Sequence, residues 1–443
     1  MSKLKNSLWR AAAFVLALSL AWISMVSGVQ AQAVASPPAA VNAKSAGVAA
    51  ATAEVLQETS RIRQLGVLRA VKSGTQTRTE IEGMLVRNLD EDSTPAELRA
   101  SQLALIKLGL APANFQLREF IIKLLTEQVA GYYDPKTQNF YLADWIDLDG
   151  QKPVIAHELT HALQDQHFDL RRFEKWPTGD SDAELAAHAL VEGDAMLTMM
   201  QYVLRNPAIA LGMLKALGGS GASATEQLDR APRVLRETLM FPYTQGMTFA
   251  TQVQRRGGWP LVSAAYKDLP QSTEQILHPE KYFAREAPVK VELPDITRSL
   301  GNGWKRLDYD VNGEWSYYLL LDEFLKSPAA SREAAAGWGG DRYAVYENAK
   351  TGAVVVAQQT VWDTPDDARE FFDAYSRRTS LRYKMDSNKL SEPAQGPNAR
   401  RDWTTNEGTV TIERRGLRVV ILEGVPEKTK ADKFLDLIWA KAN

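Results

Sequence analysis

The 443-residue chain contains no cysteine and only five histidines. Without cysteine there can be no disulfide and no lipid-attachment cysteine, so core packing, with or without a bound metal ion, must stabilise the fold. An excess of one charge is also lacking, because 52 Lys and Arg residues stand against 54 Asp and Glu residues. This balance gives no support for nucleic acid or another polyanion as a partner.

Long apolar runs are lacking except at the amino terminus. Lys3, Lys5 and Arg10 precede an apolar run at residues 11–26, and an A-x-A pattern follows at residues 31–33. This order predicts a secretory signal peptide at 1–33, cleaved after Ala33. The alternative, an uncleaved anchor, requires a longer run than this one. We therefore expect a periplasmic or secreted protein without stable membrane insertion after cleavage.

The pattern of the remaining chain indicates an α+β protein. An Ala- and Pro-rich stretch at 34–53 predicts a flexible leader, and residues 54–330 predict a mainly helical domain. That domain is expected to contain a β-hairpin formed by 129–133 and 139–143, and the GGSGAS stretch at 218–223 predicts a mobile loop. Residues 337–443 predict a separate α+β domain of unknown role.

Several elements are expected downstream of the hairpin. Helices are predicted at 182–204, 313–326, 364–377 and 430–442, and a strand is predicted at 290–296. Residues 409–414 and 417–424 predict a second hairpin that turns at Arg415 and Gly416.

The segment at 153–170 carries the most informative motif, HELTH at residues 157–161. His157 and His161 are one helical turn apart, so both imidazoles project from the same face of a helix. Two imidazoles at this spacing can hold one zinc ion, and Glu158 lies where it can act as a base on water. With histidine this rare, two unconnected histidines on a surface helix are the weaker interpretation.

A catalytic zinc site needs a third protein ligand. The predicted helix at 182–204 offers Glu184, His188 and Glu192, which share one face at four-residue spacing. Glu192 is favoured because Gly193 follows it and would let this helix approach the HELTH helix closely. His188 is the second candidate, since imidazole is an equally good ligand. Asp194 is expected to support the site without binding the metal.

These motifs resemble the gluzincin group of zinc metallopeptidases and, more narrowly, a family of exported bacterial proteins. The similar segments are GYYDP (131–135), HELTHALQDQHFDL (157–170), ALVEGDA (189–195), STEQILHPEKY (272–282) and GWGGDRY (337–343). The resemblance implies a zincin-like catalytic domain with His157, His161 and Glu192 as Zn2+ ligands and Glu158 as general base. It implies no particular substrate.

Two further residues are candidates for stabilising a tetrahedral oxyanion. His278 and Tyr282 lie in ILHPEKY, more than a hundred residues after HELTH, where related peptidases often place such a donor. For His278, a structural role in the turn before Pro279 is an equal alternative. Asp165 lies one turn beyond His161, where it could orient a ligand histidine or simply face solvent. His167 is expected to be structural.

The sequence thus predicts an exported zinc-dependent metallopeptidase that acts on peptides or proteins. One alternative is a catalytically silent zincin-fold protein that binds or scaffolds partners in the cell envelope. The presence of Glu158 argues against it, because the base has no use in a silent site. A second alternative is a zinc amidase that acts on cell-wall peptides. Metal analysis together with the activity of a Glu158 variant would separate these three functions.

Overall fold

The computed structural model describes residues 38–145, 148–176, 179–211, 228, 230–386, 396–426 and 428–441. The predicted signal peptide at 1–33 and the predicted mobile loop at 218–223 lie outside the described residues. In the described part of the chain, no helix is long and apolar enough to cross a membrane.

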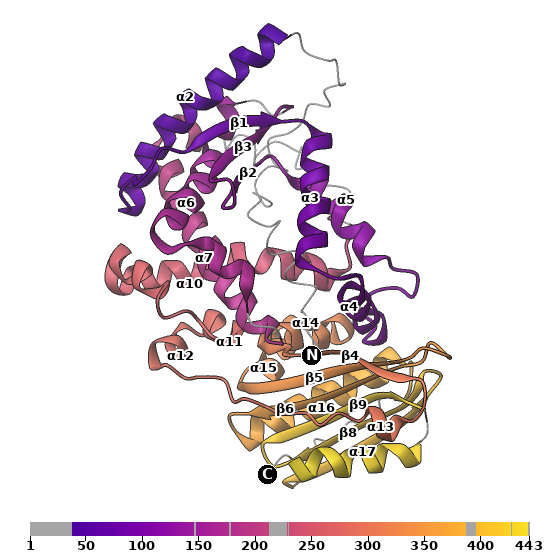
Figure 1. The fold of residues 1–443 in the computed structure, drawn as a ribbon. Helices are drawn as coiled ribbons and strands as arrows, with labels where there is room; N and C mark the ends of the chain where they lie inside the picture. Colours follow the sequence, from indigo (N-terminus) through magenta and orange to yellow (C-terminus); the bar gives the residue numbers. More distant parts are fainter. Residues whose placement is uncertain are drawn as a thin grey trace.

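The protein is an α+β structure with a small sheet near one end and a larger sheet at the other (Figure 1). The first part contains α2 (Pro38–Arg63), β1 (Lys72–Gln76), α3 (Arg78–Asp92), α4 (Pro95–Lys107), α5 (Leu117–Gln128), β2 (Gly131–Asp134), β3 (Asn139–Ala143), a 3-10 helix (Asp149–Gln151), α6 (Lys152–Phe168), a second 3-10 helix (Leu170–Lys175), α7 (Ser181–Arg205), α10 (Arg233–Ala265), α11 (Thr273–Leu277) and α12 (Pro279–Ala284).

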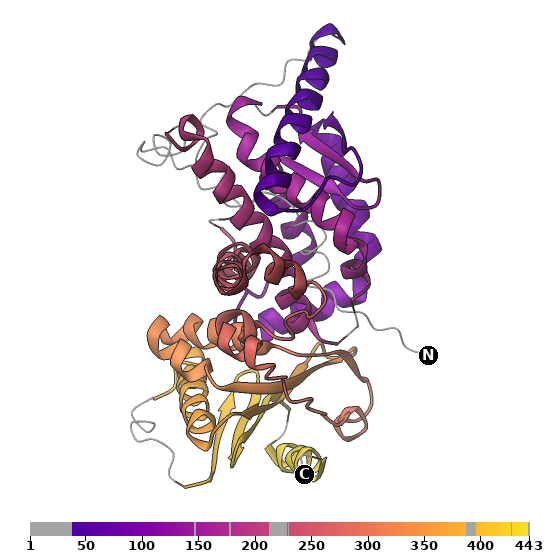
Figure 2. The ribbon, with the colours of Figure 1, turned by 90° about the vertical axis from the view of Figure 1, so that its left-hand side faces the viewer.

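The second part begins with α13 and β4 and builds the larger sheet, which lies at the opposite end of the molecule from α2 (Figure 2). Its elements are α13 (Thr297–Leu300), β4 (Trp304–Asp310), α14 (Gly313–Leu325), α15 (Pro328–Ala335), β5 (Trp338–Asn348), β6 (Val354–Trp362), α16 (Pro365–Arg382), β7 (Asn398–Thr405), β8 (Gly408–Arg415), β9 (Arg418–Val425) and α17 (Lys428–Lys441).

The larger sheet is antiparallel, with strand order β4-β5-β6-β9-β8-β7. Alternate residues of each strand face opposite sides of a sheet. Val345, Val419 and Ile421 pack with the aromatic residues of α16, whereas Tyr346 and Val420 pack with α13 and α17. Both faces of the sheet are therefore covered by helices. The predicted hairpin at Arg415 and Gly416 is confirmed as the connection between β8 and β9.

The smaller sheet has the order β1-β3-β2 and contains the predicted hairpin. β2 pairs antiparallel with β3, as the sequence predicts. β1 pairs parallel with β3 and was not predicted, because the expected pattern from Glu54 to Leu125 was helical. Its sequence, KSGTQ, contains no apolar residue and so carries no strand alternation. Pairing with β3, rather than local preference, gives this segment its extended conformation.

The predicted flexible leader at 34–53 is wrong over its described part, because α2 begins at Pro38. Alanine is the strongest helix former, and this segment is rich in it. One face of α2 is also buried against α6 and α7. The fully buried positions recur at alternating steps of four and three residues, as helix packing requires: Val48, Thr52, Val55, Thr59 and Ile62.

The predicted start of the second domain at 337 is also wrong, because β4 pairs with β5 along most of its length. The larger sheet therefore begins at Trp304, inside the range assigned to the first domain. The predicted strand at 290–296 is absent, and this segment has no regular structure. Pro294 lacks the amide hydrogen that a strand ladder needs, although Val291, Leu293 and Ile296 are buried.

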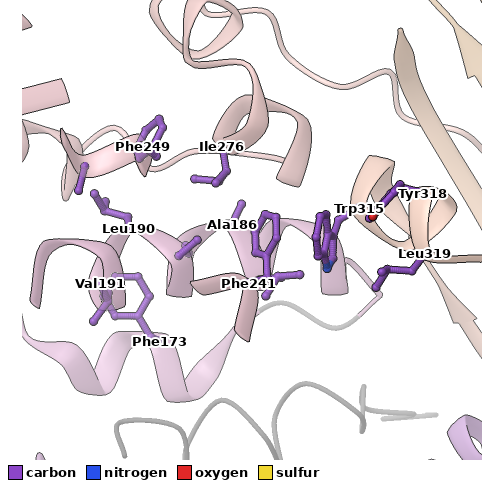
Figure 3. Packing of buried hydrophobic residues seen from close by; sticks show 14 of the residues in the cluster. Phe173, Ala186, Leu190, Val191, Phe241, Phe249, Ile276, Trp315, Tyr318 and Leu319 are labelled. Atoms are coloured by element: carbon purple, nitrogen blue, oxygen red, sulfur yellow. The ribbon is translucent and has the colours of Figure 1, made fainter. Parts of the chain in front are cut away.

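One apolar core joins the two parts of the chain. Figure 3 shows Ala186 and Leu190 of α7 beside Phe241 and Phe249 of α10, with Ile276 of α11 and Trp315 of α14 close by. The rings of Phe241 and Trp315 have their centroids 4.8 Å apart. Because α14 also packs on the larger sheet, this core connects α7 and α10 to that sheet.

Gly193 does allow a close helix approach, but the partner is α10 and not the HELTH helix as expected. A Cβ atom on Gly193 would lie 2.1 Å from the carbonyl oxygen of Gly246, and a Cβ atom on Gly246 would lie 2.1 Å from that of Ala189. These are backbone atoms, which cannot move aside as the end of a flexible side chain can. α7 and α10 therefore touch through their backbones.

We expect Gly246→Ala to lower the free energy of unfolding by about 3 kcal/mol, because the added methyl group must force α10 away from α7. Gly66→Ala is the matched control, since nothing lies within 4 Å of the position its Cβ would occupy. Urea unfolding of both variants measures the difference. Equal unfolding midpoints for Gly246→Ala and the wild type would show that the two helices do not need this contact.

Candidate metal centre

α6 presents both histidines of the HELTH motif from a buried face. Pro153 stands in the first turn, where its missing amide hydrogen costs nothing, and every residue from Pro153 to Asp165 is buried. Thr160 donates its hydroxyl to the carbonyl oxygen of Ala156, so this polar side chain is satisfied inside the helix. The spacing of His157 and His161 is thus realised in a well-packed α-helix.

α7 brings Glu192 to these two histidines. His157 Nε2 lies 3.1 Å from Glu192 Oε2, and His161 Nε2 lies 3.4 Å from the same oxygen. The two Nε2 atoms are 3.1 Å apart. All three side chains are buried, and they form one of the two His/Asp/Glu groupings in the described residues that are compact enough for a metal ion.

The size of this triangle fits zinc. Bonds of about 2.0–2.1 Å in a tetrahedral arrangement place the ligand atoms about 3.4 Å from one another. The three distances between the donor atoms, 3.1, 3.1 and 3.4 Å, are close to that separation. Two imidazoles and a carboxylate are also a donor set found in catalytic zinc sites that keep a fourth position open. The residues present therefore suit a zinc ion.

Glu158 is held beside the triangle by the small sheet. Its Oε2 accepts a hydrogen bond of 3.0 Å from the backbone amide of Tyr133 in β2. This amide lies on β2, an edge strand of the small sheet. Because it donates to Glu158, it cannot also pair with another extended chain. The hairpin that the sequence places beside the helix thus orients the Glu158 carboxylate.

The tyrosines of this hairpin point in different directions. Tyr132 donates its hydroxyl to Gln76 of β1, whereas Tyr133 donates its hydroxyl to Asp165 of α6. Asp165 also accepts hydrogen bonds from Arg69 and from the backbone of Leu170. It is buried, and it joins β2, α6 and the segment after α2. The two expectations for Asp165, a partner of a ligand histidine or a solvated acid, are therefore both wrong.

Gln164 contacts His161 at Nδ1, the ring nitrogen that does not face Glu192. Its Nε2 donates to the carbonyl oxygen of Val191 and to Asp194 Oδ2, at 3.0 and 3.1 Å. Because the amide nitrogen of Gln164 faces these two acceptors, its Oε1 faces His161. Oε1 therefore accepts a hydrogen bond from His161 Nδ1, which lies 2.8 Å away. A hydrogen on Nδ1 leaves Nε2 of His161 directed at Glu192 and available to a metal. Gln164 thus fixes the tautomer that a metal ligand needs.

Asp194 anchors this arrangement, in agreement with its expected supporting role. It forms a buried ion pair with Arg63 at the end of α2, with 2.5 Å between Arg63 Nε and Asp194 Oδ1. Its other oxygen accepts the hydroxyl of Tyr266 at 2.9 Å. Removing one partner of a buried ion pair leaves an uncompensated charge, so the whole set is interdependent. Arg63 and Tyr266 carry no motif, and only the folded arrangement identifies them.

Burial and mutual attraction set the charges of the metal-free cluster. Burial lowers the pKa of His157. Burial would also lower the pKa of His161, but the nearby Glu192 carboxylate has the larger effect and raises that pKa to about 9. Burial would raise the pKa of Glu192, yet the positive charge of His161 lowers it to about 2. A neutral His157 therefore lies beside a charged His161–Glu192 pair.

The competing ligand candidates are not part of the triangle. Among Glu184, His188 and Glu192, only Glu192 is grouped with the two histidines. His188 lies against Phe173, with ring centroids 6.3 Å apart, and burial lowers its pKa to about 4. Tyr243 of α10 does reach the site, because its ring stacks on that of His157 with 6.1 Å between centroids. No sequence motif identifies Tyr243.

The two expected oxyanion donors make their hydrogen bonds elsewhere. His278 Nε2 lies 2.9 Å from Glu314 of α14, and the Tyr282 hydroxyl donates to the backbone carbonyl of Asp268. Nothing in these contacts connects either residue with the triangle. His167 lies 2.7 Å from the carbonyl oxygen of Gly66, a contact that fits its expected structural role.

A second group of carboxylates, Glu274, Glu286 and Asp363, is already matched by a cation. Lys281 Nζ lies 2.7 Å from Glu274, 2.7 Å from Glu286 and 2.5 Å from Asp363. The ammonium occupies the position that a metal ion would take among these oxygens. The STEQILHPEKY motif therefore joins α11 and α12 to the loop after β6.

Comparison with known proteins adds one match. A family model described as a domain of unknown function (DUF8575) matches residues 300–434. The matched range contains the larger sheet and lies outside α6 and α7, so it carries no information about the triangle. No curated protein and no solved structure matches the chain.

We expect Gln164→Leu to weaken zinc binding about ten- to a hundredfold, because His161 Nδ1 loses its hydrogen-bond partner, while Asp194 keeps Arg63 and Tyr266. Gln166→Leu is the matched control on the same helix, since in the described part of the chain Gln166 hydrogen-bonds only to the backbone of Leu68 and Arg69. Competition with a chromogenic chelator measures both affinities. If the two variants bind zinc equally well, Gln164 does not position His161.

Zinc binding is expected to release about one proton below pH 9, because His161 is protonated in the metal-free protein and zinc needs its neutral form. The apparent affinity should rise about tenfold per pH unit from neutral pH and level off near the pKa of about 9. Calorimetric titration in buffers of different ionisation enthalpy counts the protons. An affinity that does not change over this range would show that His161 is already neutral.

Proposed function

We propose that the chain is an exported, zinc-dependent metallopeptidase of the gluzincin type. The observation that carries this proposal is the buried triangle of His157, His161 and Glu192. Glu158, the neighbour of His157, is held by the Tyr133 amide. The charged start and apolar run before Ala33 support the proposal that the protein acts in the periplasm or outside the cell.

A zinc ion in this triangle would supply Lewis acidity, which polarises a peptide carbonyl and makes water easier to deprotonate. Glu158 accepts the proton of the attacking water on its carboxylate and passes it to the nitrogen of the leaving amine. Tyr133 keeps that carboxylate in place through its backbone amide, so the base does not need to reorganise when the substrate binds.

The remaining groups keep the ligands in position during this proton transfer. Gln164 retains the hydrogen on His161 Nδ1, and Asp194 holds Gln164 against α7. The ring of Tyr243 stacks beside that of His157, with 6.1 Å between the ring centroids. This protein environment is pre-organised, and pre-organisation is the main source of catalytic power in hydrolases of this kind.

The sequence left two alternatives, a silent zincin-fold scaffold and a zinc amidase for cell-wall peptides. The hydrogen bond from Tyr133 to Glu158 favours catalysis over the silent scaffold, because a protein without chemistry has no need to orient the base. The amidase uses the same residues, so the choice between it and a peptidase depends on the substrate class.

Glu158→Gln is expected to lower kcat/KM for peptide hydrolysis about a thousandfold and to leave the zinc content unchanged, because only the general base is lost. Glu192→Ala should lose zinc as well as activity. Glu184→Gln is the matched control on the same face of α7 and should retain both. The measurements are metal analysis and cleavage of casein, a peptide library and cell-wall peptides.

The outcomes separate the three functions. Cleavage of casein or of the library that depends on Glu158 supports the peptidase, whereas cleavage confined to cell-wall peptides supports the amidase. A full complement of zinc without any Glu158-dependent cleavage would contradict both enzymes. A protein that binds no zinc at all would contradict the metal centre itself.

A further inference from the structure

A cavity of about 120 Å³ lies between the helical part and the larger sheet. α4, α5, α10 and α14 form its walls, and β4 and β5 contribute at one end. It is separate from the metal triangle: Ser181, which lines the cavity, stands eleven residues before Glu192 on α7, or about 16 Å along a helix.

Most of this cavity is apolar. Its walls include Leu105 of α4, Leu124 of α5, Leu235 and Leu239 of α10, and Leu320 of α14. Engineered apolar cavities of about 150 Å³ bind benzene, so a space of this size accommodates a phenyl ring or a branched alkyl group. Burial of such a group would provide the driving force for binding.

Two carboxylates, Asp308 and Asp310, lie at the polar end. Asp310 Oδ1 accepts the backbone amides of Ser181 and Val311, each at 2.8 Å, and Asp310 Oδ2 accepts the Ser181 hydroxyl. Asp310 therefore has a structural role at the start of α7. Among the residues that the structure describes, Asp308 accepts only the amide of Tyr309, at 2.8 Å, and the hydroxyl of Tyr343, at 3.0 Å.

These carboxylates can accept further hydrogen bonds. A carboxylate oxygen accepts two, so one position remains on each oxygen of Asp308 and one remains on Asp310 Oδ2. Three acceptor positions match the three hydrogens of a primary ammonium group. In the described part of the chain, neither carboxylate forms an ion pair with a Lys, Arg or His side chain within 4.0 Å.

The buried position also affects the acids themselves, although the charge of Arg306 favours the ionised form of Asp308. Burial raises the pKa of Asp308. Burial, together with the nearby charge of Asp308, raises the pKa of Asp310 to about 8. A cation among the acceptor positions would act against both pKa shifts, because an opposite charge favours the ionised form of a carboxyl group.

We propose that this cavity binds an apolar primary amine, with the ammonium on Asp308 and Asp310 and a phenyl or branched alkyl group between α4, α5 and α10. The chemistry is shared by small amines and by a peptide amino terminus whose first residue is apolar. This site goes beyond the proposed function, since it contains none of the metal ligands and its occupation does not depend on zinc.

The test is calorimetric titration of the full chain, with and without zinc, using 2-phenylethylamine and its neutral counterpart 2-phenylethanol. The amine should bind at least tenfold more tightly than the alcohol, because only the amine can form charge-assisted hydrogen bonds. Phenylalanine amide, an amino-terminal Phe-Ala dipeptide amide and the acetylated dipeptide then distinguish the sources. Binding of the free dipeptide but not of its acetylated form assigns the site to peptide amino termini.

Two variants test the two ends of the cavity. Asp308→Asn keeps the shape of the side chain but removes the charge, and it should weaken amine binding at least tenfold. Ala104→Leu extends a larger side chain from the apolar wall into the cavity, so it should weaken binding of every ligand in the series. Asp366→Asn, at an exposed acid of α16, is the control. Circular dichroism confirms that each variant is folded.

The results separate this proposal from the peptidase. Amine binding that survives in Glu158→Gln and in the zinc-free protein supports the cavity site whatever the outcome for hydrolysis. Equal affinity for the amine and the alcohol, or affinities that neither Asp308→Asn nor Ala104→Leu changes, would overturn it. Because Ala104 makes no polar contact, that variant decides the matter if Asp308→Asn does not fold.

Discussion

The backbone contact between α7 and α10 is the constraint on which the metal triangle depends. Gly193 immediately follows Glu192, and the carbonyl of Gly246 occupies the space that a side chain at 193 would need. The separation of these helices is therefore set by the backbone and cannot relax through side-chain movement. Since Glu192, the residue next to Gly193, reaches two histidines on α6, a small displacement of α7 would change the triangle directly.

A second constraint ties the amino-terminal helix to the same site. Arg63 at the end of α2 forms an ion pair with Asp194. Asp194 accepts a hydrogen bond from Gln164, and Gln164 hydrogen-bonds to His161. Each of these groups is buried, and leaving one without its partner would cost the desolvation of the other. α2 is thus a structural support of the proposed metal centre, although its sequence has the composition of a linker.

The larger sheet holds the opposite end of α7. Asp310 of β4 accepts the amide and the hydroxyl of Ser181 in the first turn of α7. The range that matches the domain of unknown function therefore contacts the helix that carries Glu192. The cavity lies at this junction, so a ligand bound there would contact α10 as well as the sheet.

The sequence determined the features that depend on local spacing. The two histidines share a face because a helix repeats every ~3.6 residues, and the hairpin before them follows from its turn residues. The sequence also limited the candidates for a third ligand to one face of one helix, while tertiary packing brought Glu192 to the histidines. Only the tertiary structure decided four other features. These are the docking of α2, the pairing of β1, the roles of Arg63 and Tyr243, and the placement of His278 away from the triangle. Each involves contacts between residues far apart in the chain, and no local pattern encodes such contacts.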